Sequence, residues 1–152
     1  MSRPADQRIY LDHAATTPMV PAAVAALTDA AQTVGNSSSL HTSGRRSRAL
    51  LEDARERIAQ VLDAHPSEVV FTSGGTEADN IAITGTYAAR TVADPGARGI
   101  VTSSIEHSAV LEPSERLVGA GALVRRAEPG PDGVVRPETA ARALDDLHAE
   151  GV

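Results

Sequence analysis

The stretch Ser73-Gly74-Gly75-Thr76 separates a short apolar run from an Ala- and Ile-rich helical pattern. Residues 69–72 are β-branched or aromatic and predict a buried strand, and Thr76 is placed to cap the helix that follows. A glycine turn lets the backbone approach a ligand, while the free N–H groups and dipole of a helix N-terminus attract an anion. The stretch is neither a dinucleotide fingerprint nor a P-loop, because it lacks a third spaced glycine and a following Lys. An ordinary capped turn explains the same residues equally well.

A second group of reactive residues, Glu106 and His107, follows a predicted strand at 99–103. From residue 68 onward, strand and helix patterns alternate, which predicts an α/β layer with parallel strands and right-handed crossovers. The remaining elements are a strand at 122–125 and helices at about 76–90, at 109–118 and from Pro137. Ligands of such sheets bind beyond the carboxyl ends of the strands, so Ser73–Thr76 and Glu106–His107 are expected to face one pocket.

The first third of the chain predicts helices and loops with less evident chemistry. Residues 9–11 suggest a short strand, and Asp12 and His13 by themselves suggest only a solvated turn. Helices are predicted from Pro21 to about residue 34 and, after a polar loop with a Ser or Thr cap, to about residue 62. The arginines of the second helix could bind an anion or a neighbouring subunit, although a solvated face is the simpler interpretation; they are Arg45, Arg46 and Arg48. His65 and His148 have no motif around them and are expected at the surface.

Composition narrows the class of protein. A length of 152 residues suggests one domain or part of a larger one, and 41% hydrophobic content with 2% aromatics predicts an aliphatic core. The net charge of −6 argues against nucleic acid as a main partner. The sequence shows no signal-peptide pattern and no apolar run of membrane-spanning length, so a cytoplasmic location without membrane association is expected.

Two residue types are absent from the whole sequence. There is no Cys, so disulfides, thiolate metal sites and thiol nucleophiles are excluded within this chain. All 14 basic residues are Arg, so no side-chain amine can form a Schiff base. No metal site is expected.

Four segments, in order along the chain, resemble the N-terminal portion of the cysteine desulfurases, pyridoxal-phosphate (PLP) enzymes of the class V aminotransferase family. They are Tyr10-Leu-Asp-His-Ala-Ala-Thr-Thr-Pro18, Gly35-Asn-Ser-Ser-Ser-Leu-His-Thr-Ser-Gly-Arg45, Val70-Phe-Thr-Ser-Gly-Gly-Thr-Glu-Ala-Asp-Asn80 and Thr102-Ser-Ser-Ile-Glu-His-Ser-Ala-Val110. The resemblance implies a fold type I large domain with a mostly parallel sheet flanked by helices. Residues 1–20 then form an N-terminal arm, and residues 21–152 form an incomplete PLP-binding large domain.

The resemblance also implies roles for individual residues. Gly75 and Thr76 correspond to residues that bind the PLP phosphate, and His107 to a catalytic histidine that stacks on the PLP ring and assists proton transfers. An imidazole suits this role because it is flat and titrates near neutrality. The family reaction converts L-cysteine to L-alanine and an enzyme persulfide for iron–sulfur cluster assembly or for tRNA and cofactor thiolation. A homodimer and a sulfur-acceptor protein or scaffold are the implied partners.

The chain departs from the family pattern where covalent chemistry is concerned. Members of the family use a lysine that binds the cofactor, a carboxylate on its pyridine nitrogen and a nucleophilic cysteine, all downstream of the matched segments. Lys and Cys are absent here, so the chain alone is expected to be an inactive fragment. Two alternatives remain open: a related PLP-dependent lyase or aminotransferase, such as one acting on selenocysteine, and a non-catalytic dimerisation or scaffold module.

Overall fold

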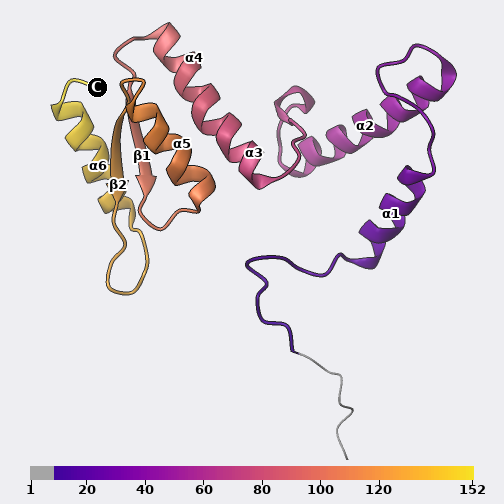
Figure 1. The fold of residues 1–152 in the computed structure, drawn as a ribbon, viewed down its shortest axis with the longest axis horizontal. Helices are drawn as coiled ribbons and strands as arrows, with labels where there is room; N and C mark the ends of the chain where they lie inside the picture. The colour runs from indigo at the N-terminus through magenta and orange to yellow at the C-terminus, as the bar shows by residue number, and fades with distance from the viewer. Residues whose placement is uncertain (1–8) are drawn as a thin grey trace, which may run out of the picture. The chain divides into compact units, whose positions relative to one another are not determined.

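The computed structural model describes residues 9–152, which divide into two compact units, one ending at Val70 and the other comprising Phe71–Val152 (Figure 1). None of the described helices combines the length and hydrophobicity needed to cross a membrane.

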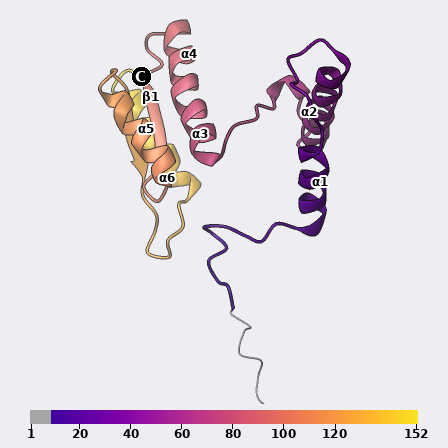
Figure 2. The same cartoon turned by 45° about the vertical axis from the view of Figure 1, so that its right-hand side comes forward.

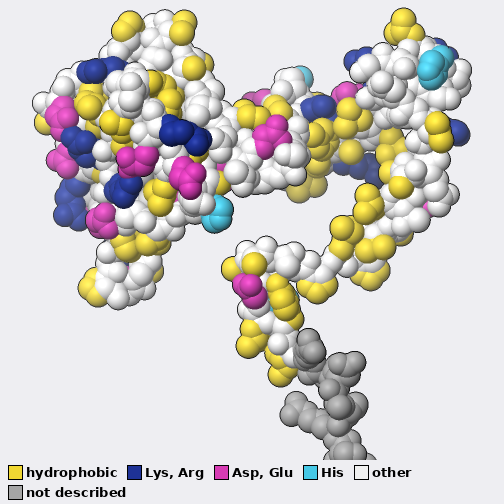
Figure 3. Space-filling view, viewed as in Figure 1, with side chains coloured by type: hydrophobic (Ala, Val, Ile, Leu, Met, Phe, Trp, Pro, Cys, Tyr) yellow, Lys and Arg dark blue, Asp and Glu magenta, His cyan; other side chains and the backbone are white. Residues whose placement is uncertain are grey.

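The described residues of the first unit form two helices and one turn of 3₁₀ helix. They are α1 (Pro21–Ala31), α2 (Thr42–Val61) and η1 (Pro66–Glu68). Pro21 occupies the first position of α1, as the sequence predicts, because a proline there lacks only an N–H that would have no partner. Few side chains are covered: Gly44 and Ala59 are the buried residues in the described part of this unit. Hydrophobic side chains remain visible along α1 in Figure 3, and Val24 and Leu27 of this helix are 47% and 60% exposed.

The loop between α1 and α2 packs tightly against the first turn of α2. A Cβ atom added to Gly35 would lie 2.3 Å from the carbonyl oxygen of Ser43, and one added to Gly44 would lie 2.3 Å from that of Ser39. The side chain that caps α2 is His41, whose Nδ1 accepts the N–H of Gly44 at 3.3 Å. The expected Ser or Thr cap is therefore wrong. The loop places His41 immediately before the helix, so that Thr42 and Ser43 already belong to its first turn.

The second unit begins with an uninterrupted helical run of three segments. It comprises α3 (Gly75–Asn80), a π-helical segment η2 (Ile81–Gly85) and α4 (Thr86–Ala93). The remaining elements are β1 (Gly99–Ser103), α5 (Ser108–Val118), β2 (Leu123–Ala127) and α6 (Pro137–Ala149). The helices agree with the predicted pattern to within a few residues, which is the usual uncertainty at helix ends.

The two strands form a parallel sheet in which Gly99 pairs with Leu123 and Ser103 pairs with Ala127. Helix α5 is the crossover between them, and both α5 and α6 contact the sheet (Figures 1 and 2). Leu147 of α6 is 2% exposed and is the largest buried aliphatic side chain of this core. The predicted α/β layer with a parallel crossover is confirmed for this part of the chain.

Two predicted strands are absent from the described residues. Residues 69–72 and 9–11 have no strand assignment, and Val70 and Ile9 are 67% and 75% exposed. A β-branched run becomes a strand only when a neighbouring strand satisfies its backbone groups, and the described sheet consists of β1 and β2 alone. These two predictions are wrong for that reason. The predicted strand at 122–125 exists but spans Leu123–Ala127.

Candidate functional site

The turn before α3 has the general form expected from its glycines but a different cap. Gly74 precedes the helix in an extended conformation and gives no side-chain cap, while Thr76 lies inside the first turn. Thr76 therefore does not cap α3. Instead, the carboxylate of Glu77 accepts both the N–H and the hydroxyl of Ser73, each at 2.6 Å. These two bonds lower the pKa of Glu77 by stabilising its carboxylate.

The backbone at the start of α3 is open to a ligand. Within the described residues, the N–H groups of Gly75 and Thr76 have no acceptor, because they belong to the first helical turn. A Cβ atom added to Gly74 or Gly75 would meet nothing within 4 Å. Free donors, open space and the positive end of a helical run that continues to Ala93 make this turn suitable for an anion.

His107 caps α5, the crossover helix. Its Nδ1 accepts the N–H of Ala109 at 3.1 Å, and its own carbonyl oxygen accepts the N–H of Val110 at 2.9 Å. When the imidazole is neutral, an accepting Nδ1 leaves the proton on Nε2. The side chain is exposed, so the Nε2–H can interact with a ligand. The cap fixes the tautomer and the position of the ring.

The helical run from Gly75 and helix α5 lie side by side and run in the same direction. Arg116 donates to Asn80 at 2.9 Å, and further along both helices the Tyr87 hydroxyl donates to the carbonyl oxygen of Ala120 at 3.4 Å. The first turns of the two helices, which carry Thr76 and His107, therefore lie at the same end of the pair. This is also the end toward which β1 points in Figure 1.

Polar side chains secure the turn between β1 and α5. The hydroxyl of Ser104 donates to the carboxylate of Glu128 at 2.5 Å, and the Ser104 N–H donates to the carbonyl oxygen of Ala127 at 3.1 Å. The Ser103 hydroxyl accepts the N–H of Ile105. These bonds fix the path of the backbone that leads to His107. Glu128, Asn80 and Arg116 could not be found from the sequence, because the partners that they bond across the unit are 24 or more residues away along the chain.

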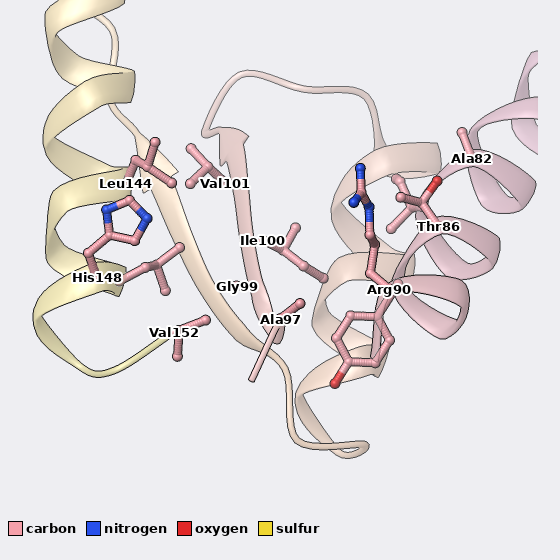
Figure 4. A pocket seen from close by; sticks show the side chains of 13 residues that line it. Ala82, Thr86, Arg90, Ala97, Gly99, Ile100, Val101, Leu144, His148 and Val152 are labelled. Atoms are coloured by element: carbon pink, nitrogen blue, oxygen red, sulfur yellow. The ribbon is translucent and has the colours of Figure 1, made fainter. Parts of the chain in front are cut away.

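The expectation that Ser73–Thr76 and Glu106–His107 face one pocket stays a prediction. An apolar hollow of about 610 Å³ in this unit is lined by other residues. Figure 4 shows Leu144, His148 and Val152 on one side of it, Ala82, Thr86 and Arg90 on the other, and Ile100 of β1 between. Gly75, Thr76 and His107 are instead exposed at the surface, so the described residues supply only part of a binding site.

The other sequence candidates have structural partners within the first unit. The edge of the Tyr10 ring points at His13, with ring centroids 5.1 Å apart, and the Asp12 carbonyl oxygen accepts the N–H of Ala15 in a turn. Arg45 donates to the Leu40 carbonyl oxygen and so holds the loop before α2. His65 and His148 are exposed, as expected, and the ring of His65 also caps η1. The described residues contain no group of three or more His, Asp or Glu side chains that could hold a metal ion.

Comparisons with known proteins give the chain its family. The profile of the family described as aminotransferase class-V matches residues 9–149. The chain is 53% identical over 136 residues to the IscS-like cysteine desulfurase of Mycobacterium tuberculosis, covering 89% of this chain and 35% of that protein. It is 40% identical over 140 residues to cysteine desulfurase IscS of Azotobacter vinelandii, covering 90% of this chain and 34% of that protein.

A solved structure agrees with this assignment. SspA in complex with cysteine matches with a TM-score of 0.78 and 32% identity, covering 88% of this chain and 38% of that one. The chain thus spans about a third of the length of the relatives it matches. Since the family profile matches nearly all of the described residues, the chain belongs to the class-V aminotransferase family.

Proposed function

We propose that this chain is the N-terminal, phosphate-binding part of a PLP-dependent cysteine desulfurase. The observation that carries the proposal is the position of the open helix start at Gly75 and Thr76 at the same end of one helix pair as His107. One helix start presents N–H donors to an anion, and the other presents a flat imidazole with a free Nε2. This combination fits a cofactor that joins a phosphate to an aromatic ring.

The residues present have defined tasks in that function. The N–H groups of Gly75 and Thr76, with the Thr76 hydroxyl, bind the phosphate dianion, and the open space around both glycines admits it. His107 would cover the pyridine ring, and the Nε2–H of its neutral imidazole would donate a hydrogen bond there. When bound, PLP supplies an electron sink for the carbon that carries the substrate amine. The hydrogen bond from Ala109 to Nδ1 keeps the proton of the neutral His107 ring on Nε2.

The proposed substrate is L-cysteine. Relatives with 53% and 40% identity are named cysteine desulfurases, and SspA has been solved in complex with cysteine. We further propose a homodimer that delivers sulfur, in the cytoplasm, to an acceptor protein for iron–sulfur cluster assembly or for tRNA and cofactor thiolation. The absence of Lys and Cys means that the chain alone binds without turning over substrate.

A binding experiment tests the proposal on the chain itself. Isothermal titration with PLP is expected to give saturable binding that inorganic phosphate competes, with a lower affinity for pyridoxal, which lacks the phosphate. Thr76→Val should weaken PLP binding, because it removes the hydroxyl. Thr139→Val is a matched control, since Thr139 also lies in the first turn of a helix but in α6. Absence of binding at millimolar PLP would count against the proposal.

A second function, a non-catalytic association module, is favoured by one observation. The Arg98 carbonyl oxygen and the Ser104 N–H bond toward β2, so the alternate peptide groups, such as those of Val101, face the other edge of β1. No described strand pairs with that edge, and unpaired edges promote association. Analytical ultracentrifugation together with the PLP titration distinguishes the two functions, because a non-catalytic module should associate without binding PLP.

A further inference from the structure

Asn80 joins the two parts of the candidate site. Its side-chain NH₂ donates to the carbonyl oxygen of Thr76 at 2.9 Å, and its side-chain oxygen accepts from the guanidinium of Arg116 at 2.9 Å. Thr76 lies in the turn proposed to bind phosphate, and Arg116 lies in the last turn of the helix that begins after His107. We infer that Asn80 is a positioning residue that sets the phosphate-binding turn relative to His107.

The NH₂ group and the oxygen of the Asn80 side-chain amide each make one hydrogen bond, and the two cannot exchange places. The NH₂ group is the donor that a carbonyl oxygen requires, and the side-chain oxygen is the acceptor that a guanidinium requires. Exchanging the two ends would place a donor against Arg116 and an acceptor against the Thr76 carbonyl. The network therefore fixes the orientation of the amide, and with it the register between α3 and α5.

The backbone of Asn80 is fixed as well. Its carbonyl oxygen accepts the hydroxyl of Thr84 at 2.5 Å, and the π-helical segment begins at the next residue, Ile81. A π segment widens the helix, and the Thr84 hydroxyl bonds the backbone where this widening begins. Asn80 thus lies between the first turn of its helical run, which belongs to the candidate site, and the rest of that run. Asn80 as a whole is half-buried, while its two side-chain bonds lie at the surface.

Substitutions separate the two bonds of Asn80. Asn80→Ala removes both, while Asn80→Asp keeps an acceptor for Arg116 and loses the donor to the Thr76 carbonyl oxygen. Arg116→Ala removes only the hydrogen bond from Arg116 to Asn80, which joins the two helices. Arg136→Ala is the matched control, because Arg136 is also an exposed arginine of this unit but bonds Asp132 within its own loop.

The inference rests on the proposed function, and the test reads out more than PLP affinity. In ¹⁵N-labelled chain, Asn80→Ala and Arg116→Ala are each expected to shift the ring nitrogen resonances of His107, and Arg136→Ala is not. Asn80→Ala should weaken PLP binding about tenfold, the loss of one to two hydrogen bonds. Asn80→Asp should shift the Thr76 and Gly75 amide resonances while leaving those of His107 closer to the wild type.

The outcomes separate failure of the inference from failure of the proposed function. If the unaltered chain does not bind PLP, the proposed function fails whatever Asn80 does, and the His107 resonances still test the linkage. If PLP binds and neither Asn80→Ala nor Arg116→Ala moves His107 or the affinity, the inference is overturned. A thermal unfolding scan of each variant shows whether it remains folded. Should Asn80→Ala unfold, Arg116→Ala decides, because it removes a side chain that lies at the surface.

Discussion

The two units of the chain are built from similar apolar contents but are stabilised in different ways. In the described residues up to Val70, only Gly44 and Ala59 are buried, and the close contacts are between backbone atoms in the loop from Gly35 to Gly44. In Phe71–Val152, two paired strands and the helices against them bury Ala109, Ala122, Ala127, Ala143 and Leu147. A sheet gives helices a common surface to cover, whereas α1 and α2 have none. The second unit therefore has a core, and the first has mainly local packing.

The largest expected effect comes from breaking the core of the second unit. Leu147→Ala should lower its free energy of unfolding by about 2–5 kcal/mol, because a large side chain that is 2% exposed leaves a cavity. Loss of hydrogen-exchange protection in β1 and β2 measures this. Leu51→Ala in α2, where the side chain is 36% exposed, is the matched change in the first unit. An equal loss of hydrogen-exchange protection in the two units would contradict the conclusion that they are stabilised in different ways.

A smaller effect is expected from the tight loop of the first unit. Gly44→Ala places a Cβ atom 2.3 Å from the Ser39 carbonyl oxygen, so the loop must move, at a cost of about 1–3 kcal/mol. The loss should be confined to amides of the loop and of the start of α2, measured by hydrogen exchange. If hydrogen-exchange protection in β1 also falls, the two units are energetically coupled. They are then less distinct in how they are stabilised.

A gain in stability, and not a loss, is expected when a glycine without close neighbours is replaced by alanine. Gly85→Ala lies in the helical run of the second unit, where an added Cβ meets nothing within 4 Å. Alanine should stabilise that helix by about 0.5–1 kcal/mol, because glycine loses more backbone entropy on folding. A raised thermal midpoint measures the gain. A lowered midpoint would mean that the π-helical segment needs the glycine for its geometry.

The smallest expected effect concerns pH. The bonds from Ser73 lower the pKa of Glu77 below its ordinary value, so the folded chain holds this carboxylate more strongly ionised than the unfolded chain does. The contribution is present above the ordinary pKa and is lost as pH falls through the lowered value. Side-chain NMR titration should show the lowered pKa, and Ser73→Ala should return it toward the ordinary value. An unchanged pKa in Ser73→Ala would contradict this account of the turn.

The helices of both units could be read from the sequence because their signals are local. Pro21 and Pro137 occupy first helical positions, and the alternation after residue 68 gave the order of helices and strands. The strands at 9–11 and 69–72 were predicted wrongly from equally local signals. A helix satisfies its own backbone groups, whereas a strand depends on a neighbour that its own sequence does not identify. The caps at His41 and Gly74 were missed because the loop path selects the capping residue.

The sequence by itself determined the family resemblance, the residues Gly75, Thr76 and His107 as candidates, and the absence of any Lys or Cys for covalent chemistry. Residue identity and order suffice for these conclusions. Only the tertiary structure decided that the two helix starts lie at one end of a parallel pair and that Asn80 and Arg116 join them. It also decided that Gly75, Thr76 and His107 are exposed rather than enclosed. Such relations depend on contacts between residues far apart in the chain, and their geometry arises only when the helices pack.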